Sequence, residues 1–207
     1  MCWKNVKKIF YSSSACVYPE FNQLNPLDPN CSKRFFYLAQ PDSEYGWEKL
    51  FSERIYLAFN KNHNLEVRIG SFHNAYTPMG TWQGGEKVPA AMIRKAIEAN
   101  ENDSIEAWGS GEKTRSFLYI EECVNAVIQL MNSNHKEPIN IGSGRLKTIN
   151  DLAKKKITLS NKKIEIINLE GGDFIKKYGL PCQLGVMGRN SDNTVLKSCL
   201  VGKFIKI

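Results

Sequence analysis

Two short segments rich in β-branched and aromatic residues, separated by one long amphipathic segment, constrain the fold most. Residues 6–12 and 65–71 have the composition of buried strands. Residues 42–62 between them place Trp47, Phe51 and other apolar residues at helical spacing. Because a strand, a helix and a strand in this order form the crossover unit of a parallel sheet, the chain is predicted to begin as an α/β fold.

The rest of the sequence continues this alternation with shorter segments. Thr148 and Asp151 form a capping pair that predicts the start of one helix. The stretch from Gly171 to Gly188 is rich in glycine and has little periodicity, so an irregular loop is expected there. Further strands are predicted at residues 105–108, 117–120, 138–141 and 163–168, and further helices at residues 89–97, 121–131 and 148–157.

The net charge of +7 favours acidic partners, and the phosphates of a small ligand fit it as well as nucleic acid does. Nucleic acid is not expected as a partner, because no recognition-helix, RNA-binding or zinc-finger pattern accompanies the charge. The six cysteines form no Cys-x-x-Cys pair, which argues against a metal site and for reduced thiols in the cytoplasm. No stretch is long and apolar enough to span a bilayer, so no membrane association is expected.

Tyr45 and Lys49 have the spacing that places two side chains on one face of a helix, one turn apart. An ammonium group beside a phenol stabilises the phenolate, which can then accept a proton from a hydroxyl group at neutral pH. An amphipathic helix with a chance tyrosine and an exposed lysine explains the same spacing. The serine-rich strand end at residues 12–14 lies upstream and completes a Ser, Tyr, Lys order.

This order resembles the short-chain dehydrogenases. Within that class, residues 14–20, Ser-Ala-Cys-Val-Tyr-Pro-Glu, are similar to the GDP-mannose 3,5-epimerases, in which a cysteine at the position of Cys16 is distinctive. Several later blocks resemble the same family in the same order: Arg68-Ile69-Gly70, Phe72-His73-Asn74, Gly80-Thr81-Trp82, Gly84-Gly85-Glu86-Lys87, Thr114-Arg115-Ser116-Phe117 and Gly188-Arg189-Asn190-Ser191-Asp192-Asn193.

The resemblance implies a partial Rossmann-like parallel sheet, the C-terminal half of an NAD-binding domain, with a small mixed α/β substrate domain. Residues 1–80 would belong to the first domain and residues 81–207 mainly to the second, with residues 116–142 returning to the first. The sequence has no Gly-x-Gly-x-x-Gly or Gly-x-x-Gly-x-x-Gly motif, which would hold a dinucleotide pyrophosphate. The chain is therefore expected to be truncated relative to the family and to lack the adenosine half of the NAD site.

The resemblance further implies an isomerase that converts GDP-mannose to GDP-L-galactose for L-ascorbate biosynthesis, with NAD as cofactor. Tyr45 would remove the proton of the C4 hydroxyl, and Lys49 would hold the nicotinamide ribose. After C4 is oxidised, Cys16 and a partly buried Lys87 would exchange protons at C3 and C5 from opposite faces of the ring. Hydride return to C4 would leave no net oxidation.

The resemblance also assigns contacts to the nucleotide sugar and implies a homodimer built through helices that include the one carrying Tyr45. Arginine suits the diphosphate because its fork can bind two oxygens. The substrate-binding residues implied are Ser14, Ala15, Cys16, Asn74, Glu86, Lys87, Val88, Lys95, Lys113, Thr114, Arg115 and Arg189.

Two other functions stay open at this point. A non-catalytic remnant that binds a nucleotide sugar explains the missing glycine-rich motif. Another nucleotide-sugar enzyme, such as a 4-epimerase or a 4,6-dehydratase, would share Tyr45 and Lys49, although Cys16 and Lys87 argue against it. Without the resemblance, Cys16 is read as a buried apolar thiol and Lys87 as a solvated loop lysine.

Overall fold

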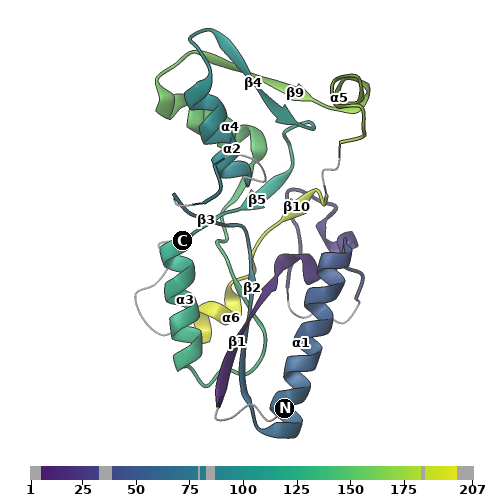
Figure 1. Cartoon of the computed structure of the whole chain (residues 1–207), viewed down its shortest axis with the longest axis vertical. Coiled ribbons are helices and arrows are strands. Elements are labelled where there is room, and N and C mark those ends of the chain that lie inside the picture. Colours follow the sequence, from purple (N-terminus) through teal and green to yellow (C-terminus); the bar gives the residue numbers. More distant parts are fainter. Residues whose placement is uncertain (1–5, 33–38, 79, 83–86, 183–184, 200–207) are drawn as a thin grey trace.

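A parallel sheet carries the first part of the fold in the computed structural model, which describes residues 6–32, 39–78, 80–82, 87–182 and 185–199. The sheet has the order β1 (Lys8–Ser14), β2 (Glu66–Phe72) and β7 (Ile139–Ile141). The long helix α1 (Glu44–His63) connects β1 to β2, and α3 (Ile120–Asn132) precedes β7. Figure 1 shows α1 and α3 on either side of these strands.

A second group of elements forms the upper part of the molecule in Figure 1. There β4 (Asp103–Trp108) pairs in parallel with β9 (Ile164–Leu169), and α2 (Val88–Glu98) packs on α4 (Ile149–Ser160). The remaining elements are β3 (Ala75–Tyr76) paired with β6 (Leu118–Tyr119), β5 (Thr114–Ser116) between β10 (Gly188–Arg189) and β8 (Leu146–Thr148), and the helices η1 (Ala15–Val17), η2 (Glu20–Gln23), α5 (Gly171–Tyr178) and α6 (Thr194–Cys199).

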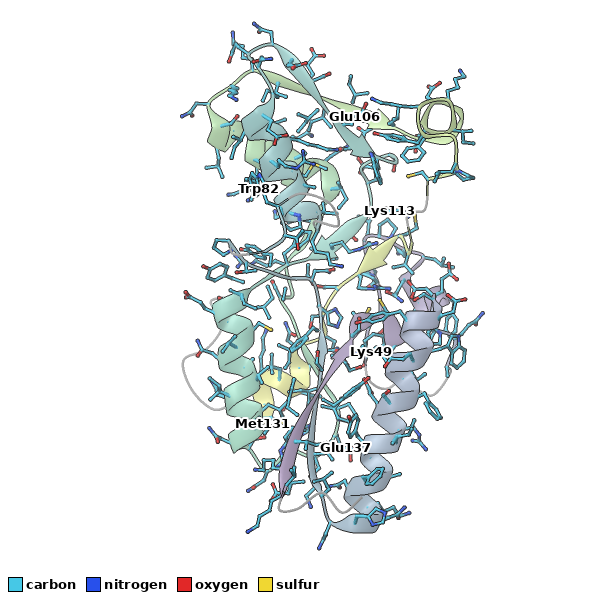
Figure 2. The ribbon with its side chains drawn as sticks, in the orientation of Figure 1. Lys49, Trp82, Glu106, Lys113, Met131 and Glu137 are labelled. Atoms are coloured by element: carbon cyan, nitrogen blue, oxygen red, sulfur yellow. The ribbon has the colours of Figure 1, made fainter. Side chains whose placement is uncertain are left out.

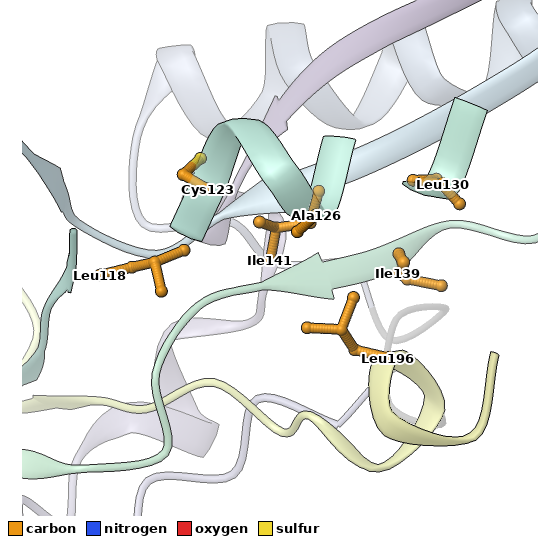
Figure 3. Close-up of a cluster of buried hydrophobic side chains, with 7 residues drawn as sticks. All are labelled: Leu118, Cys123, Ala126, Leu130, Ile139, Ile141 and Leu196. Carbon is orange, nitrogen blue, oxygen red and sulfur yellow. The ribbon is translucent and has the colours of Figure 1, made fainter. Parts of the chain in front are cut away.

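Each part has its own apolar core. In the lower part, side chains from α3, β6, β7 and α6 meet, and Figure 3 shows Leu130 above Ile139, with Leu196 below that strand. Burial there raises the pKa of the Cys123 thiol to about 11, so this thiol stays protonated. The upper part has a smaller cluster around Met92 and Ile105. A third cluster joins Val17 and Tyr18, just after β1, to Cys31 and Leu50. The division of the chain into two domains remains a prediction.

The structure confirms the predicted strand, helix and strand at the start of the chain, with α1 between the parallel strands β1 and β2. The capping pair is also confirmed, because Thr148 Oγ1 accepts a hydrogen bond of 2.9 Å from the backbone N–H of Asp151. Within the described residues, no helix is both long enough and apolar enough to cross a membrane.

The predicted irregular loop between Gly171 and Gly188 is wrong in its first part, because residues 171–178 form α5. Phe174 is buried on this helix, and its ring lies 5.3 Å from the ring of Trp108 and 4.6 Å from that of Tyr178. Gly179 ends the helix in the left-handed conformation, with φ of 74°. Gly171, Gly172 and Gly179 thus lie at the two ends of a helix.

Tyr18 ties the segment after β1 to β7, and removing its hydroxyl tests this link. Burial raises the pKa of Tyr18 well above its usual range, and its hydroxyl donates a hydrogen bond of 2.6 Å to Asn140 Oδ1. Tyr18→Phe leaves that oxygen without this donor, so we expect the free energy of unfolding to fall by about 1–3 kcal/mol in urea titration. Tyr56→Phe, at a partly exposed tyrosine, is the control, and equal stabilities of the two variants would contradict the prediction.

Candidate active site

Cys16 lies just beyond the carboxyl end of β1, the edge of a parallel sheet at which ligands bind in α/β folds. Ser14 is the last residue of β1, and its side chain accepts a hydrogen bond of 3.2 Å from the backbone N–H of Cys16. Ala15 is buried, whereas Cys16 is partly exposed. The short helix η1 therefore holds the thiol at the sheet edge, where a ligand can reach it.

The backbone of α1 lies directly against Cys16, and Gly46 makes this approach possible. A Cβ atom at position 46 would lie 2.7 Å from Pro41 Cβ, 3.1 Å from the carbonyl carbon of Cys16 and closer still to its oxygen. Only glycine fits there. Sequence reasoning missed this residue, although a glycine in the first turn of a helix next to a candidate base was a usable signal.

Tyr45 and Lys49 share a face of α1, as their spacing predicted. Lys49 Nζ lies 5.4 Å from the centre of the Tyr45 ring and 5.3 Å from that of Tyr11 on β1. The Tyr45 side chain is 52% exposed, and Figure 2 shows Lys49 projecting from α1 toward the strands. Burial raises the pKa of Tyr11, while its contacts with Ser52 and Lys49 act in the opposite direction.

Arg189 brings the end of the chain to Cys16. Its Nη1 donates to Cys16 Sγ at 3.1 Å, and its Nη2 forms an ion pair of 2.9 Å with Asp42. Its Nε donates a hydrogen bond of 2.6 Å to Gln23 Oε1. Arg189 is only 9% exposed, so the guanidinium is held in one orientation by three side chains.

A second guanidinium, that of Arg115, lies near the same group of charges. Burial lowers the pKa of Arg115 to about 10, and the charge of Arg189 acts in the same direction, while Asp42 and Cys16 oppose it. Arg115 donates hydrogen bonds of 2.8 Å to the carbonyl oxygens of Thr114 and Val186. Two cations thus face a single carboxylate and a thiol, an arrangement that favours an anionic ligand.

The neighbouring substrate candidates make contacts with backbone carbonyls in this structure. Lys113 Nζ donates to Gly185 O at 2.6 Å, and burial lowers the pKa of Lys113. Figure 2 shows Lys113 where the upper and lower parts meet. Thr114 Oγ1 donates to Pro26 O, and Asn74 Nδ2 donates to Ser116 O at 3.0 Å.

Three candidates lie around α2. Lys95 Nζ donates a hydrogen bond of 2.6 Å to the carbonyl oxygen of Glu106, so its ammonium is engaged with β4 rather than projecting from an exposed helix face. Val88 begins α2 and is 37% exposed. Lys87 precedes the same helix and makes no capping hydrogen bond through its side chain. It is exposed, whereas the sequence interpretation expected it to be partly buried. Glu86 lies outside the described residues.

A shallow pocket of about 190 Å³ lies beside Lys87. Lys87 therefore faces a concave, partly aromatic surface, but the described contacts do not link it to Cys16, Tyr45 or Lys49. The structure joins Cys16 to Arg189, and Tyr45 to Lys49, and it leaves Lys87 and Lys95 on a separate element. The pocket is lined by Ala75, Tyr76, Thr77, Pro78, Gly80, Thr81, Trp82, Lys87, Pro89, Ala90 and Ile93.

The sequence is similar to a family of nucleotide-sugar enzymes. Residues 1–142 match the NAD dependent epimerase/dehydratase family. The chain is 42% identical to GDP-mannose 3,5-epimerase of Arabidopsis thaliana and 41% identical to GDP-mannose 3,5-epimerase 1 of Oryza sativa subsp. japonica, each over 94% of this chain and 48% of the relative. The chain thus spans about half the length of the curated relatives it matches.

Solved structures show the same fold. A UDP-glucose 4-epimerase of Thermotoga maritima matches with a TM-score of 0.74 at 25% identity, over 94% of this chain and 57% of that one. A GDP-6-OMe-4-keto-L-xylo-heptose reductase of C. jejuni matches with a TM-score of 0.78 at 20% identity, over 98% of this chain and 67% of that one. These matches confirm the predicted α/β class with a partial Rossmann-like parallel sheet.

Proposed function

The chain belongs to the NAD dependent epimerase/dehydratase family, and we propose from this premise that it supplies the catalytic residues of a GDP-mannose 3,5-epimerase. The observation that carries the proposal is that the start of α1 packs against the Cys16 backbone at Gly46. This contact brings two pairs of side chains to the same edge of the sheet. One pair is Cys16 with Arg189 donating to its sulfur, and the other is Tyr45 with Lys49 on α1. The identity of 42% to the Arabidopsis thaliana enzyme over most of this chain supports the choice of substrate.

Tyr45 and Lys49 are the residues of this chain that would hold NAD. They fit the nicotinamide end, because the phenol is half exposed and the ammonium lies beside its ring. When bound, NAD supplies a hydride acceptor at the C4 position of the sugar and returns the hydride afterwards. The chain has no glycine-rich dinucleotide motif, so the proposal assigns no pyrophosphate contact to its residues.

The proton transfers in this proposal fall to three side chains. Tyr45 accepts the proton of the C4 hydroxyl, since the Lys49 ammonium nearby stabilises the phenolate. Cys16 exchanges a proton with the ring carbon beside the C4 ketone, and the Arg189 guanidinium stabilises its sulfur while it is an anion. Lys87, at the start of α2, exchanges the proton on the opposite face of the ring.

Arg115 and Lys113 are proposed to bind the diphosphate of the substrate. Arg115 lies near the charges of Arg189 and Asp42, and Lys113 lies near Arg115. Both donate to carbonyl oxygens that a phosphate can replace as acceptors. Ser14, Ala15, Asn74, Glu86, Val88, Lys95, Thr114 and Arg189 complete the proposed substrate contacts.

We further propose a cytoplasmic homodimer that contributes to L-ascorbate biosynthesis. The exposed aromatic stripe of α1 supports the dimer. Its members Trp47, Phe51 and Phe59 are 49%, 67% and 45% exposed and follow one another along one helix face. A second copy of this helix would cover them.

Binding of the nucleotide sugar without turnover is the second candidate function. The guanidinium groups of Arg115 and Arg189 favour it, because their charges suit an anionic ligand whether or not turnover follows. A 4-epimerase or 4,6-dehydratase shares Tyr45 and Lys49 but has no use for a thiol with a guanidinium donor, so the contact between Cys16 and Arg189 disfavours it.

The proposal is tested by incubating the chain with GDP-mannose and NAD in deuterated water. We expect deuterium at C3 and C5 by mass spectrometry, and we expect Cys16→Ala to lower the exchange rate at least about 100-fold, the usual contribution of a general acid or base. Cys182→Ala, on the segment after α5, is the control and should retain the rate of the parent chain.

The outcomes separate the candidates. Binding of GDP-mannose by calorimetry without any exchange would support the binding function instead. Exchange that survives Cys16→Ala would remove Cys16 from the role proposed for it. Exchange confined to C4, or loss of water from the sugar, would point to one of the related enzymes.

A further inference from the structure

Gln23 is a fully buried polar side chain beside the candidate active site, and neither the resemblance nor the proposed mechanism gives it a role. It is the last residue of the short helix η2. Its Oε1 accepts a hydrogen bond of 2.6 Å from Arg189 Nε. Its Nε2 donates hydrogen bonds of 3.2 Å to the carbonyl oxygens of Tyr18 and Pro19.

These hydrogen bonds connect Gln23 to Cys16 in two ways, through the backbone that follows Cys16 and through Arg189. Tyr18 and Pro19 lie just after Cys16 and Val17 in the chain, so the amide nitrogen of Gln23 holds the backbone segment that carries the thiol. The amide oxygen of Gln23 holds Arg189, whose Nη1 donates to the sulfur of that thiol at 3.1 Å. One side chain thus fixes both the hydrogen-bond donor and the segment that carries its acceptor.

Asp42 is the other support of Arg189, but its effect on Cys16 is mixed. It orients the guanidinium through the ion pair of 2.9 Å, and its negative charge also repels a thiolate. Gln23 carries no charge, so its replacement changes the orientation of Arg189 and leaves the total charge of the group unaltered. A substitution at position 23 therefore measures how the orientation of Arg189 affects Cys16, separately from any change in charge.

We propose that Gln23 is a positioning residue that sets the reactivity of Cys16 by holding Arg189 toward its sulfur. A thiolate is the nucleophilic form of cysteine, and a guanidinium that donates to sulfur stabilises that form. The proposal rests on the proposed function only for the catalytic meaning of Cys16, because thiol reactivity can be measured without substrate or cofactor.

The test is the alkylation rate of each cysteine by iodoacetamide at neutral pH, resolved by peptide mass spectrometry. In Gln23→Leu, which removes the amide and keeps the bulk, we expect the Cys16 rate to fall about tenfold, equivalent to about 1.4 kcal/mol. The rate of Cys182 should not change. Gln129→Leu makes the same substitution on α3, away from these contacts, and should leave the Cys16 rate unaltered.

A double variant distinguishes positioning from a general loss of structure. If Gln23 acts through Arg189, Gln23→Leu should slow Cys16 no further in the Arg189→Met background. Cys123, buried in the core, reports folding because it should stay unreactive in every folded variant. If Gln23→Leu exposes Cys123, Gln23→Met takes its place with the same expectation, since methionine has a similar length and adapts to irregular spaces.

Three results would overturn the inference: an unchanged Cys16 rate in the folded Gln23 variant, a faster rate, or fully additive effects in the double variant. None of them depends on turnover. If the chain bound GDP-mannose but exchanged no deuterium, the proposed function would fail while the alkylation result still decided the role of Gln23.

Discussion

Gly46→Ala is expected to lower the free energy of unfolding by about 3 kcal/mol and to abolish any activity that depends on Cys16. In an ordinary helix this substitution would stabilise the chain by up to about 1 kcal/mol, because alanine has the higher helix propensity. Here the new Cβ would overlap the carbonyl group of Cys16 and lie 2.7 Å from Pro41 Cβ. Neither the Cys16 carbonyl group nor the Pro41 ring can move away without moving the backbone. The start of α1 and the Cys16 segment must therefore separate.

The measurement is urea unfolding together with the alkylation rate of Cys16. Gly172→Ala on α5 is the matched control, because a Cβ there would meet no atom within 4 Å and should leave stability unchanged or slightly higher. A Gly46→Ala variant as stable as this control would mean that α1 and the Cys16 segment are not in close contact in solution.

Arg189→Met is expected to have the other large effect, a loss of about 3 kcal/mol of folding free energy. The side chains of Arg189 and Asp42 are only 11% and 14% exposed, so removing the cation leaves a carboxylate away from water without its ion-pair partner. Gln23 Oε1 and Cys16 Sγ lose a donor at the same time. Denaturant titration at neutral pH measures the loss.

Two comparisons identify the cause of that loss. Arg94→Met removes the i,i+4 ion pair with Glu98 on α2 and should cost less than about 1 kcal/mol. Adding Asp42→Asn to Arg189→Met should recover part of the stability, because the unpaired carboxylate is then gone. No recovery would mean that the lost packing of the arginine side chain, and not the stranded charge, dominates.

Much of the fold could be predicted because the spacing of apolar residues along the sequence matches the helices and strands that form. The spacing of Trp47 and Phe51 predicted α1, and the strand-like segments around it predicted β1 and β2. The pattern failed at α5, where Gly171, Gly172 and Gly179 suggested a loop. Phe174 of that helix packs on Trp108. These two residues are far apart in sequence, so a prediction from neighbouring residues alone does not include their contact.

The candidate site divides in the same way. Tyr45 and Lys49 could be suggested by their helical spacing and Cys16 by the resemblance of residues 14–20 to a known family, and their roles are predictions. Gln23 and Asp42 could not be found, because each acquires its place by contacting Arg189, a residue 166 positions after Gln23. A neutral amide in an irregular segment gives no signal until the fold brings its partner to it.

The contact between Arg189 and Cys16 also has a consequence for the order in which the chain matures. The two residues are separated by 173 positions, and Arg189 lies on β10, which pairs with β5. During synthesis the thiol emerges long before its donor, and so long a loop closes only when most of the chain is in place. In a nascent or partly folded chain Cys16 therefore lacks this donor, and the contact between the two residues forms late in folding.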